Sequence, residues 1–172
     1  MLWQKKFEKF RQILRPSVDM DIDAKTMCCP CGCTEETAKP MGTRPRSPLS
    51  DRNKTYVGCC GRYLDNGEAA PTAEALMRSR YTAYTLGRED YLLRTWHHST
   101  RPSSLELANK PHSAHCKWLG LEVRRHEQLE PDSMLVEFVA RYKVDGRARR
   151  LHEISHFVRE AGQWFYVDGK IV

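Results

Sequence analysis

The sequence lacks the features of a membrane-spanning or secreted protein. Its 172 residues contain no long apolar run, whereas a membrane-spanning helix needs about 18 or more apolar residues in succession. The amino terminus has no apolar core followed by a small-residue cleavage site, so it does not resemble a secretion signal. No internal repeat is visible either. These absences favour a protein of the cytoplasm, where thiols stay reduced.

Charge and apolar content are those of an ordinary globular protein. Hydrophobic residues make up 40% of the chain and charged residues 29%, which indicates one domain with a real core and a small appendage. The net charge is +6, of which residues 1–60 contribute +4, with 11 Lys/Arg against 7 Asp/Glu. This charge permits contact with nucleic acid or an acidic protein, but a solvated surface is its more common cause. No basic stripe interleaved with aromatic residues supports a nucleic-acid binder.

Six of the seven cysteines lie in two tight clusters, in segments 28–33 and 59–60. A disulfide framework would instead scatter cysteines along the chain to join distant loops. Thiols spaced this closely direct their sulfurs to one point, and thiolate is a preferred ligand of zinc. Because 27 residues (59 − 31 − 1) separate Cys31 from Cys59, the pattern predicts two half-sites joined by a loop. We therefore expect a small zinc module over residues 27–66.

Four of these cysteines form the expected ligand set: Cys29, Cys31, Cys59 and Cys60. Four sulfurs give a closed tetrahedral shell, which is typical of a structural rather than a catalytic zinc. Cys28 and Cys33 are spare and could replace a ligand. Two alternatives stay open, namely redox-active thiols without a metal and iron in place of zinc.

The segment before this module and the loop within it differ in composition. Residues 1–15 predict a basic amphipathic helix that ends at Pro16, and a polar linker follows up to residue 26. The helix could bind a membrane surface or a partner, or it could pack on the main domain or on a second subunit. Residues 34–55 are rich in proline and charge, so we expect a flexible loop within the cysteine module.

The remainder, residues 67–172, predicts an α+β domain. One helix begins after Pro71, with Thr72 as its cap, and ends near Gly87. A second begins at Glu89, and a third short helix is expected between Ser103 and Asn109. Period-two patterns separated by turn signals then predict four strands, over residues 118–126, 134–144, 148–159 and 163–172. The result is three helices packed on one face of a curved four-stranded antiparallel sheet, which would enclose a cone-shaped cavity.

Polar residues within that cone form a second candidate site. Alternation places on one face of the third strand Leu151, Glu153, Ser155 and Phe157. A carboxylate on an apolar face must be paired or hydrogen-bonded, and Arg78 and Arg80 on the first helix are candidate partners. With His97 and Tyr142, these residues could bind a small molecule or perform acid–base chemistry. An Arg–Glu pair that only ties helix to sheet is the simpler interpretation.

Two stretches of this sequence resemble known motifs. The run Cys29-Pro30-Cys31-Gly32, completed by Cys59-Cys60-Gly61, resembles the SEC-C zinc motif. The same motif occurs in the tail of the bacterial preprotein translocase ATPase, where it contacts a chaperone and the ribosome. The resemblance thus implies zinc and an interaction surface. In this chain Cys33 stands where the motif usually has serine, and the spacer between the cysteine pairs is longer.

The rest is similar to the YchJ family of small bacterial proteins, which implies a nuclear-transport-factor-2-like domain. The similar stretches, in order, cover residues 73–81, 90–92, 95–97, 118–121, 138–142 and 163–169. The family supplies no activity, and sheets of this fold often pair into homodimers. Residues 1–26 have no counterpart in it. They are either an extension or precede a true start at Met20 or Met27.

Three functions follow as hypotheses. The first is a zinc-stabilised adaptor that contacts a protein or the ribosome, because four thiolates leave no open coordination position. The second is a small-molecule-binding protein or enzyme that uses the cone cavity, an analogy at the level of the fold. The third is a nucleic-acid binder. We favour the adaptor, and with it a protein that is not an enzyme.

Overall fold

The computed structural model describes residues 27–33, 54–107 and 117–172. The amino-terminal helix predicted over residues 1–15, most of the loop predicted over 34–55, and Cys116 lie outside the described residues. Three helices are described: α2 (Gly61–Leu64), α3 (Ala73–Thr85) and α4 (Glu89–Arg94). Four strands follow them: β1 (Lys117–Glu130), β2 (Ser133–Val144), β3 (Arg147–Glu160) and β4 (Gln163–Ile171). The predicted α+β order of helices followed by a meander is confirmed.

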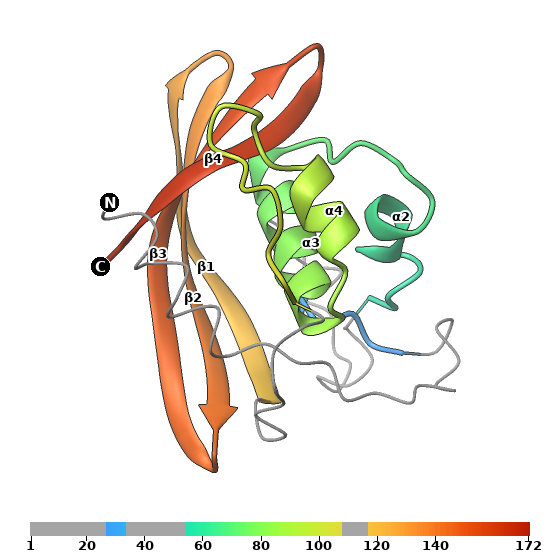
Figure 1. Cartoon of the computed structure of the whole chain (residues 1–172), viewed down its shortest axis with the longest axis vertical. Coiled ribbons are helices and arrows are strands. Elements are labelled where there is room, and N and C mark those ends of the chain that lie inside the picture. The colour runs from blue at the N-terminus through green and yellow to red at the C-terminus, as the bar shows by residue number, and fades with distance from the viewer. Residues whose placement is uncertain (1–26, 34–53, 108–116) are drawn as a thin grey trace, which may run out of the picture.

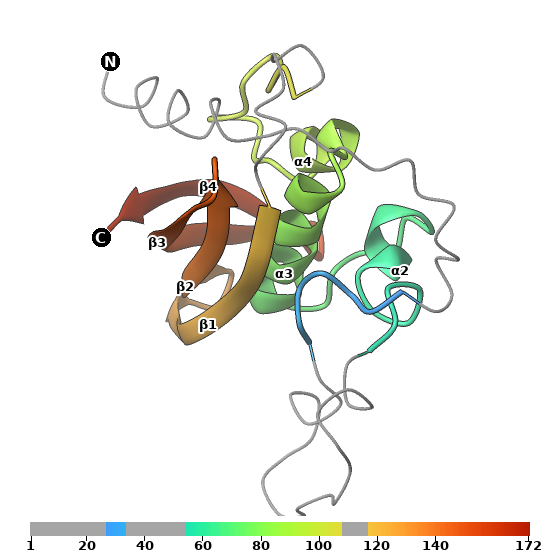
Figure 2. The same cartoon turned by 90° about the horizontal axis from the view of Figure 1, so that it is seen from below.

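The strands form one antiparallel sheet in the order β1-β2-β3-β4. Figure 1 shows the long strands bending around α3, which packs against one face of the sheet. Seen from below in Figure 2, α3 lies between the sheet on one side and α2 with the cysteine segments on the other. The first long helix is therefore the shared wall of both candidate sites.

Local side-chain and backbone geometry explains where the helix α3 begins and where the strands turn. The side chain of Thr72 accepts a hydrogen bond from the amide of Ala75, at 3.1 Å, which caps α3 as predicted. The β2–β3 turn has positive φ at both Asp145 (50°) and Gly146 (75°). The β3–β4 turn does the same at Ala161 and Gly162. Two consecutive positive φ values are what a two-residue hairpin with right-handed strand twist requires.

The prediction of a third helix between Ser103 and Asn109 is wrong over the described residues 103–107, which are irregular with bends at Ser103 and Leu107. Glu106 has a φ of 53°, which interrupts any right-handed helix. The amides of Leu105 and Leu107 instead donate to the carboxylate of Glu89, at 2.9 and 2.8 Å. Although burial opposes it, these bonds hold the pKa of Glu89 below its usual value. A long-range carboxylate thus satisfies the backbone that a helix would have satisfied internally.

The core lies between α3, α4 and the sheet. Trp96, directly after α4, is buried and packs edge-on against the ring of Tyr166, with centroids 4.9 Å apart. The backbone is joined at the same place, because the amide of His97 donates to Tyr166 and the amide of Tyr166 donates to Thr95. The end of α4 is thereby fixed on β4. No helix among the described residues is long and apolar enough to cross a membrane.

Candidate functional site

The two cysteine segments pair with each other as a short antiparallel ribbon. The amide of Cys29 donates to the carbonyl of Lys54 at 2.9 Å, and the amide of Lys54 donates to Cys33 at 3.0 Å. Tyr56 bonds Met27 in the same way at 2.8 Å. Because Cys33 and Lys54 are direct neighbours, the chain leaves and returns at one point. The long spacer therefore does not separate the two half-sites.

Four thiols gather at the base of this ribbon: Cys29, Cys31, Cys59 and Cys60. Their sulfur atoms all lie within 4.8 Å of one another. The Sγ atoms of Cys31 and Cys59 are 3.6 Å apart, and those of Cys59 and Cys60 are 4.0 Å apart. A tetrahedral metal with bonds of about 2.3 Å needs sulfur separations of about 3.8 Å. The spacing therefore fits one four-coordinate ion, and these are the four cysteines of the expected ligand set.

The two spare cysteines lie at the margin of this cluster. Cys28 is exposed, and Cys33 is half-buried. Cys33 is close enough to the thiols of Cys31 and Cys59 to raise their pKa. Neither belongs to the group of four mutually close sulfurs.

Three of these four thiols have pKa values far from those of ordinary free cysteines. Hydrogen bonds from the side chains of Cys31, Cys59 and Cys60 hold the pKa of Cys29 well below its usual value. The neighbouring thiols push the pKa of Cys31 and of Cys59 well above theirs. One thiolate thus suppresses ionisation of the others, because like charges so close together repel strongly. All four can be thiolates together only around a cation.

The sequence around Cys60 explains how the second half-site is shaped. The amides of Cys59 and Gly61 both donate to the carbonyl of Tyr56, at 3.1 and 2.8 Å. A Cβ on Gly61 would lie 2.9 Å from that same oxygen and 3.0 Å from the tyrosine ring. Only glycine fits there, which is the physical reason for glycine after the cysteine pair. Helix α2 begins at this glycine.

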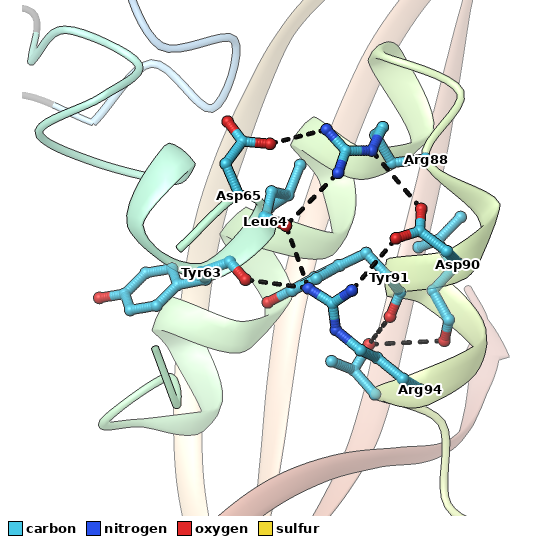
Figure 3. Close-up of polar contacts among 9 residues, drawn as sticks. Tyr63, Leu64, Asp65, Arg88, Asp90, Tyr91 and Arg94 are labelled. Atoms are coloured by element: carbon cyan, nitrogen blue, oxygen red, sulfur yellow. Dashed lines mark hydrogen bonds and ion pairs between the residues drawn. The ribbon is translucent and has the colours of Figure 1, made fainter. Parts of the chain in front are cut away.

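A network of arginines ties α2 to α4 (Figure 3). Arg88 donates to Asp65 at 2.7 Å, and Arg94 donates to the carbonyls of Tyr63 and Leu64, both at 3.1 Å. The carbonyls at the end of a helix have no partner within it, and basic side chains are favourable there. The cysteine segments are therefore held against the helical layer across the predicted boundary at residue 66.

The cone encloses a second site between α3 and the sheet. It is a cavity of about 60 Å³. The lining includes all four residues that alternation placed on this face of β3, together with Phe138 and Ala140 of β2. Rings form much of the remaining wall: Tyr81, Tyr84, Trp118 and Tyr166. An apolar wall with a few polar groups is typical of a ligand pocket.

Two buried charged residues face this cavity. Arg80 is 5% exposed, and its Nη1 donates to the carbonyl of Leu92 and to Oγ1 of Thr95, both at 2.7 Å. Its guanidinium carbon lies 5.1 Å from the ring centroid of Trp96 and 4.6 Å from that of Tyr166. Burial lowers the pKa of Arg80, while nearby tyrosines and Glu153 oppose that shift.

Glu153 is also 5% exposed. Its carboxylate accepts hydrogen bonds from the hydroxyls of Ser155 at 2.7 Å and Tyr166 at 3.2 Å. Burial and the charge of Glu153 raise the pKa of Tyr166 well above its usual value, which keeps this hydroxyl protonated as a donor. Burial likewise raises the pKa of Tyr84 to about 12. The carboxylate lies over Gly169 of β4, where a Cβ would overlap it.

The other three residues expected here lie elsewhere. Arg78 lies at the cysteine centre, where it bonds Glu74 at 2.8 Å and the carbonyl of Cys31 at 3.3 Å. His97 bonds Ser99 and Glu160 near the β3–β4 turn. Tyr142 is buried but packs on Trp118 without lining the cavity. Of the five residues expected in the cavity, Arg80 and Glu153 are the two that line it.

Sequence reasoning missed two of the groups that complete this site, Tyr84 and Tyr166. Both could have been found from periodicity. Tyr84 follows Arg80 by four residues, so the two side chains share a helix face. Tyr166 lies on one of the two alternating faces of the strand predicted over residues 163–172. Which of these faces meets the cavity depends on the strand register, and the sequence alone does not give that register.

Comparison with known proteins now decides the family. The model of the YchJ middle NTF2-like domain matches residues 72–169. A UPF0225 protein from Polaromonas naphthalenivorans (strain CJ2) is 52% identical over 145 residues, which cover 84% of this chain and 97% of that protein. One from Chromobacterium violaceum is 57% identical over 118 residues, 67% of this chain and 86% of that protein. The chain belongs to the YchJ (UPF0225) family. The resemblance seen in the sequence is confirmed.

Two solved structures resemble this YchJ-family chain. The solution structure of a SEC-C motif containing protein from Rhodopseudomonas palustris has 33% identity and a TM-score of 0.61, covering 70% of this chain and 94% of that one. The crystal structure of a SEC-C motif containing protein from Psychrobacter arcticus has 25% identity and a TM-score of 0.63, covering 86% and 84%. Both combine the expected motif with a related fold.

The contact between Glu153 and Gly169 gives a test of the cavity geometry. We expect Gly169→Ala to lower the free energy of unfolding by about 1–3 kcal/mol, the usual cost of forcing extra volume into a packed site. Glu153→Ser removes the overlapping carboxylate, so the double variant is expected to lose less than the sum of the two single losses. Urea unfolding of the four proteins measures the coupling. Strictly additive losses would contradict the described packing.

Proposed function

We propose that this chain is a zinc-binding SEC-C-motif protein that acts as an adaptor, contacting a protein or the ribosome through its cysteine centre. The closed four-sulfur cluster is the observation that carries the proposal. Cys29, Cys31 and Cys60 are buried and Cys59 is partly so. A zinc ion held by all four has no position left for a substrate, so its contribution is to fix the surrounding backbone.

The surface next to these ligands supports a contact role. Val57 lies on the turn that leads into Cys59 and Cys60, and it is 43% exposed. The turn belongs to the part of the molecule that lies on the side of α3 away from the sheet (Figure 2). An exposed apolar side chain on a metal-fixed turn is preorganised, which lowers the entropic cost of binding a partner.

Metal content is the first test of this proposal. Elemental mass spectrometry of the untagged protein, purified under reducing conditions, is expected to give about one zinc per chain. Cys59→Ser is expected to lose the zinc, because three sulfurs leave the shell open, whereas exposed Cys28→Ser keeps it. Thermal melting checks that each variant still folds. A metal-free wild type with all thiols reactive would contradict the proposal and favour a redox cluster.

Partner contact is tested separately with a variant that keeps the cysteines. Val57→Asp is expected to retain its zinc and to weaken co-sedimentation with purified ribosomes by roughly tenfold, since about 1.5 kcal/mol of apolar burial is lost. Val172→Asp is the matched control, because Val172 is 63% exposed and its amide bonds the carbonyl of His152 in the sheet rather than the cysteine segments. A wild type that stays in the supernatant would contradict ribosome contact. Equal losses in both variants would contradict a role for the turn.

We propose a second function for the cone, that it binds a small neutral molecule built around one ring. Its support is the combination of a ring-walled cavity with a buried donor, Arg80, and a buried acceptor, Glu153. Their opposite charges make the site neutral overall. A volume of about 60 Å³ corresponds to about four to six water positions at 10–15 Å³ each, which suits a single ring rather than a larger cofactor.

Benzamide is a suitable probe, because its amide offers one acceptor and one donor on a planar ring. We expect amide chemical shifts around the cavity to move on titration with benzamide. Ala140→Val, which fills the cavity, should weaken binding by about tenfold, the scale of overpacking costs of 1–3 kcal/mol. Exposed Ala148→Val is the control on the next strand. Shifts that persist unchanged in Ala140→Val would place the binding elsewhere.

A further inference from the structure

A cluster of basic side chains lies on the hairpin that joins β2 and β3 and at the start of β1 beside it. We call this cluster the basic hairpin, and it consists of Lys117, Arg141, Lys143, Arg147, Arg149 and Arg150. All six are exposed. Figure 1 shows this end of the sheet, at the bottom of the view, extending past α3 and α4. The side chains are therefore carried on an arm away from the helical layer.

Positive charge is concentrated here. The six basic residues stand against two nearby acids, Asp145 and Glu122, which gives a local excess of 6 − 2 = +4, although residues 61–172 as a whole carry only +2. Arg141 bonds Glu122 at 2.6 Å. The other five form no ion pair with any residue in the described ranges. Most of this positive charge is thus unmatched within that part of the protein.

The strand register makes the cluster costly for folding. Arg141 lies directly opposite Arg150, and Lys117 lies directly opposite Lys143. Like charges in directly opposed positions destabilise an antiparallel pair. Neither pair contributes to the core, since all four side chains are exposed. Binding of a polyanion would turn this repulsion into favourable contacts.

The charges lie on both faces of the sheet at this end, where β1, β2 and β3 run side by side and only the tip, residues 144–147, is two-stranded. Alternation puts Arg147 and Arg149 on the face of Leu151 and Glu153, and puts Arg150 on the opposite face. A flat anionic membrane would meet only one face of such an arm. Among the large exposed apolar side chains of the described ranges, Leu119 on β1 alone lies beside the cluster and none lies within residues 141–150, which is too little for insertion into lipid.

A nucleic-acid groove, in contrast, has a phosphate backbone on each side. The two-stranded tip over residues 144–147 is narrow enough for the major groove, which is about 12 Å wide in B-DNA, and basic residues stand behind it on both faces. Four of the six basic residues are arginine, whose planar guanidinium suits bidentate contact with phosphate. We propose that the basic hairpin binds the phosphate backbones of double-stranded DNA by entering its major groove. The proposal is independent of the cysteine centre and of the cone cavity.

Salt dependence provides the test. Fluorescence anisotropy would follow binding of the full chain to 20-base-pair DNA and RNA duplexes of matched sequence, between 50 and 200 mM salt. If all six side chains contact phosphates, affinity should fall about 1,000-fold over that range, because the logarithmic slope is about −0.9 per contact. Arg147→Gln/Arg149→Gln/Arg150→Gln removes three contacts. Its affinity should then fall only about 40-fold over the same range.

The matched control changes net charge equally at other exposed arginines, as Arg101→Gln/Arg125→Gln/Arg159→Gln. It should keep the wild-type slope, and Cys59→Ser should do so too, which separates this result from any failure of the zinc centre. Tighter binding to the RNA duplex, whose major groove is deep and narrow, would overturn entry of the major groove. Equal weakening by both triple variants would show a net-charge effect and overturn the proposal. Tighter binding to phosphatidylserine vesicles than to either duplex would also overturn it.

Discussion

The buried guanidinium of Arg80 is the interaction on which the rest of the structure depends. It projects from α3, donates to the end of α4 through Leu92 and Thr95, and lies over the rings of Trp96 and Tyr166. Burying a charge is costly unless hydrogen bonds and aromatic faces replace its water. Here the hydrogen bonds are accepted by Leu92 and Thr95 at the end of α4, and the aromatic faces are those of Trp96, which follows α4, and Tyr166 of β4. The residue therefore fixes α3, α4 and β4 at a single point, and the cavity forms beside it.

Helix geometry then explains why α3 serves two sites. Arg78 and Arg80 are two residues apart, which rotates their side chains by about 200° around the helix axis. One therefore reaches the cysteine centre while the other faces the sheet. Treating both as partners of Glu153 ignored this rotation, although the sequence alone contains it. Four thiolates around a divalent cation would leave two negative charges, and the guanidinium of Arg78, bonded to Cys31, lies where it offsets them.

The meander, its turns and the Thr72 cap could be predicted because they depend on neighbouring residues. The cysteine cluster could also be predicted, since four thiols in two short segments have few ways to be arranged. The segment after Ser103 could not, because Glu89 satisfies its amides from another element. Tyr142 shares a face of β2 with the cavity residues Phe138 and Ala140 but does not line the cavity, whereas His97 lies on no strand and bonds Glu160 near the β3–β4 turn. Alternation assigns a face of the sheet but not how far along it the helix covers that face.

The basic hairpin shows the same limit in charge. Counted by thirds of the chain, the basic excess lies at the amino terminus, and residues 61–172 carry only 17 − 15 = +2. The sheet register brings Lys117 beside Lys143 and Arg141 beside Arg150. Most of the acidic residues in segment 61–172 lie outside this cluster. A field depends on separation in space, and at physiological salt it falls off within about 8 Å. Charge summed along a sequence therefore cannot reveal a patch that only strand pairing assembles.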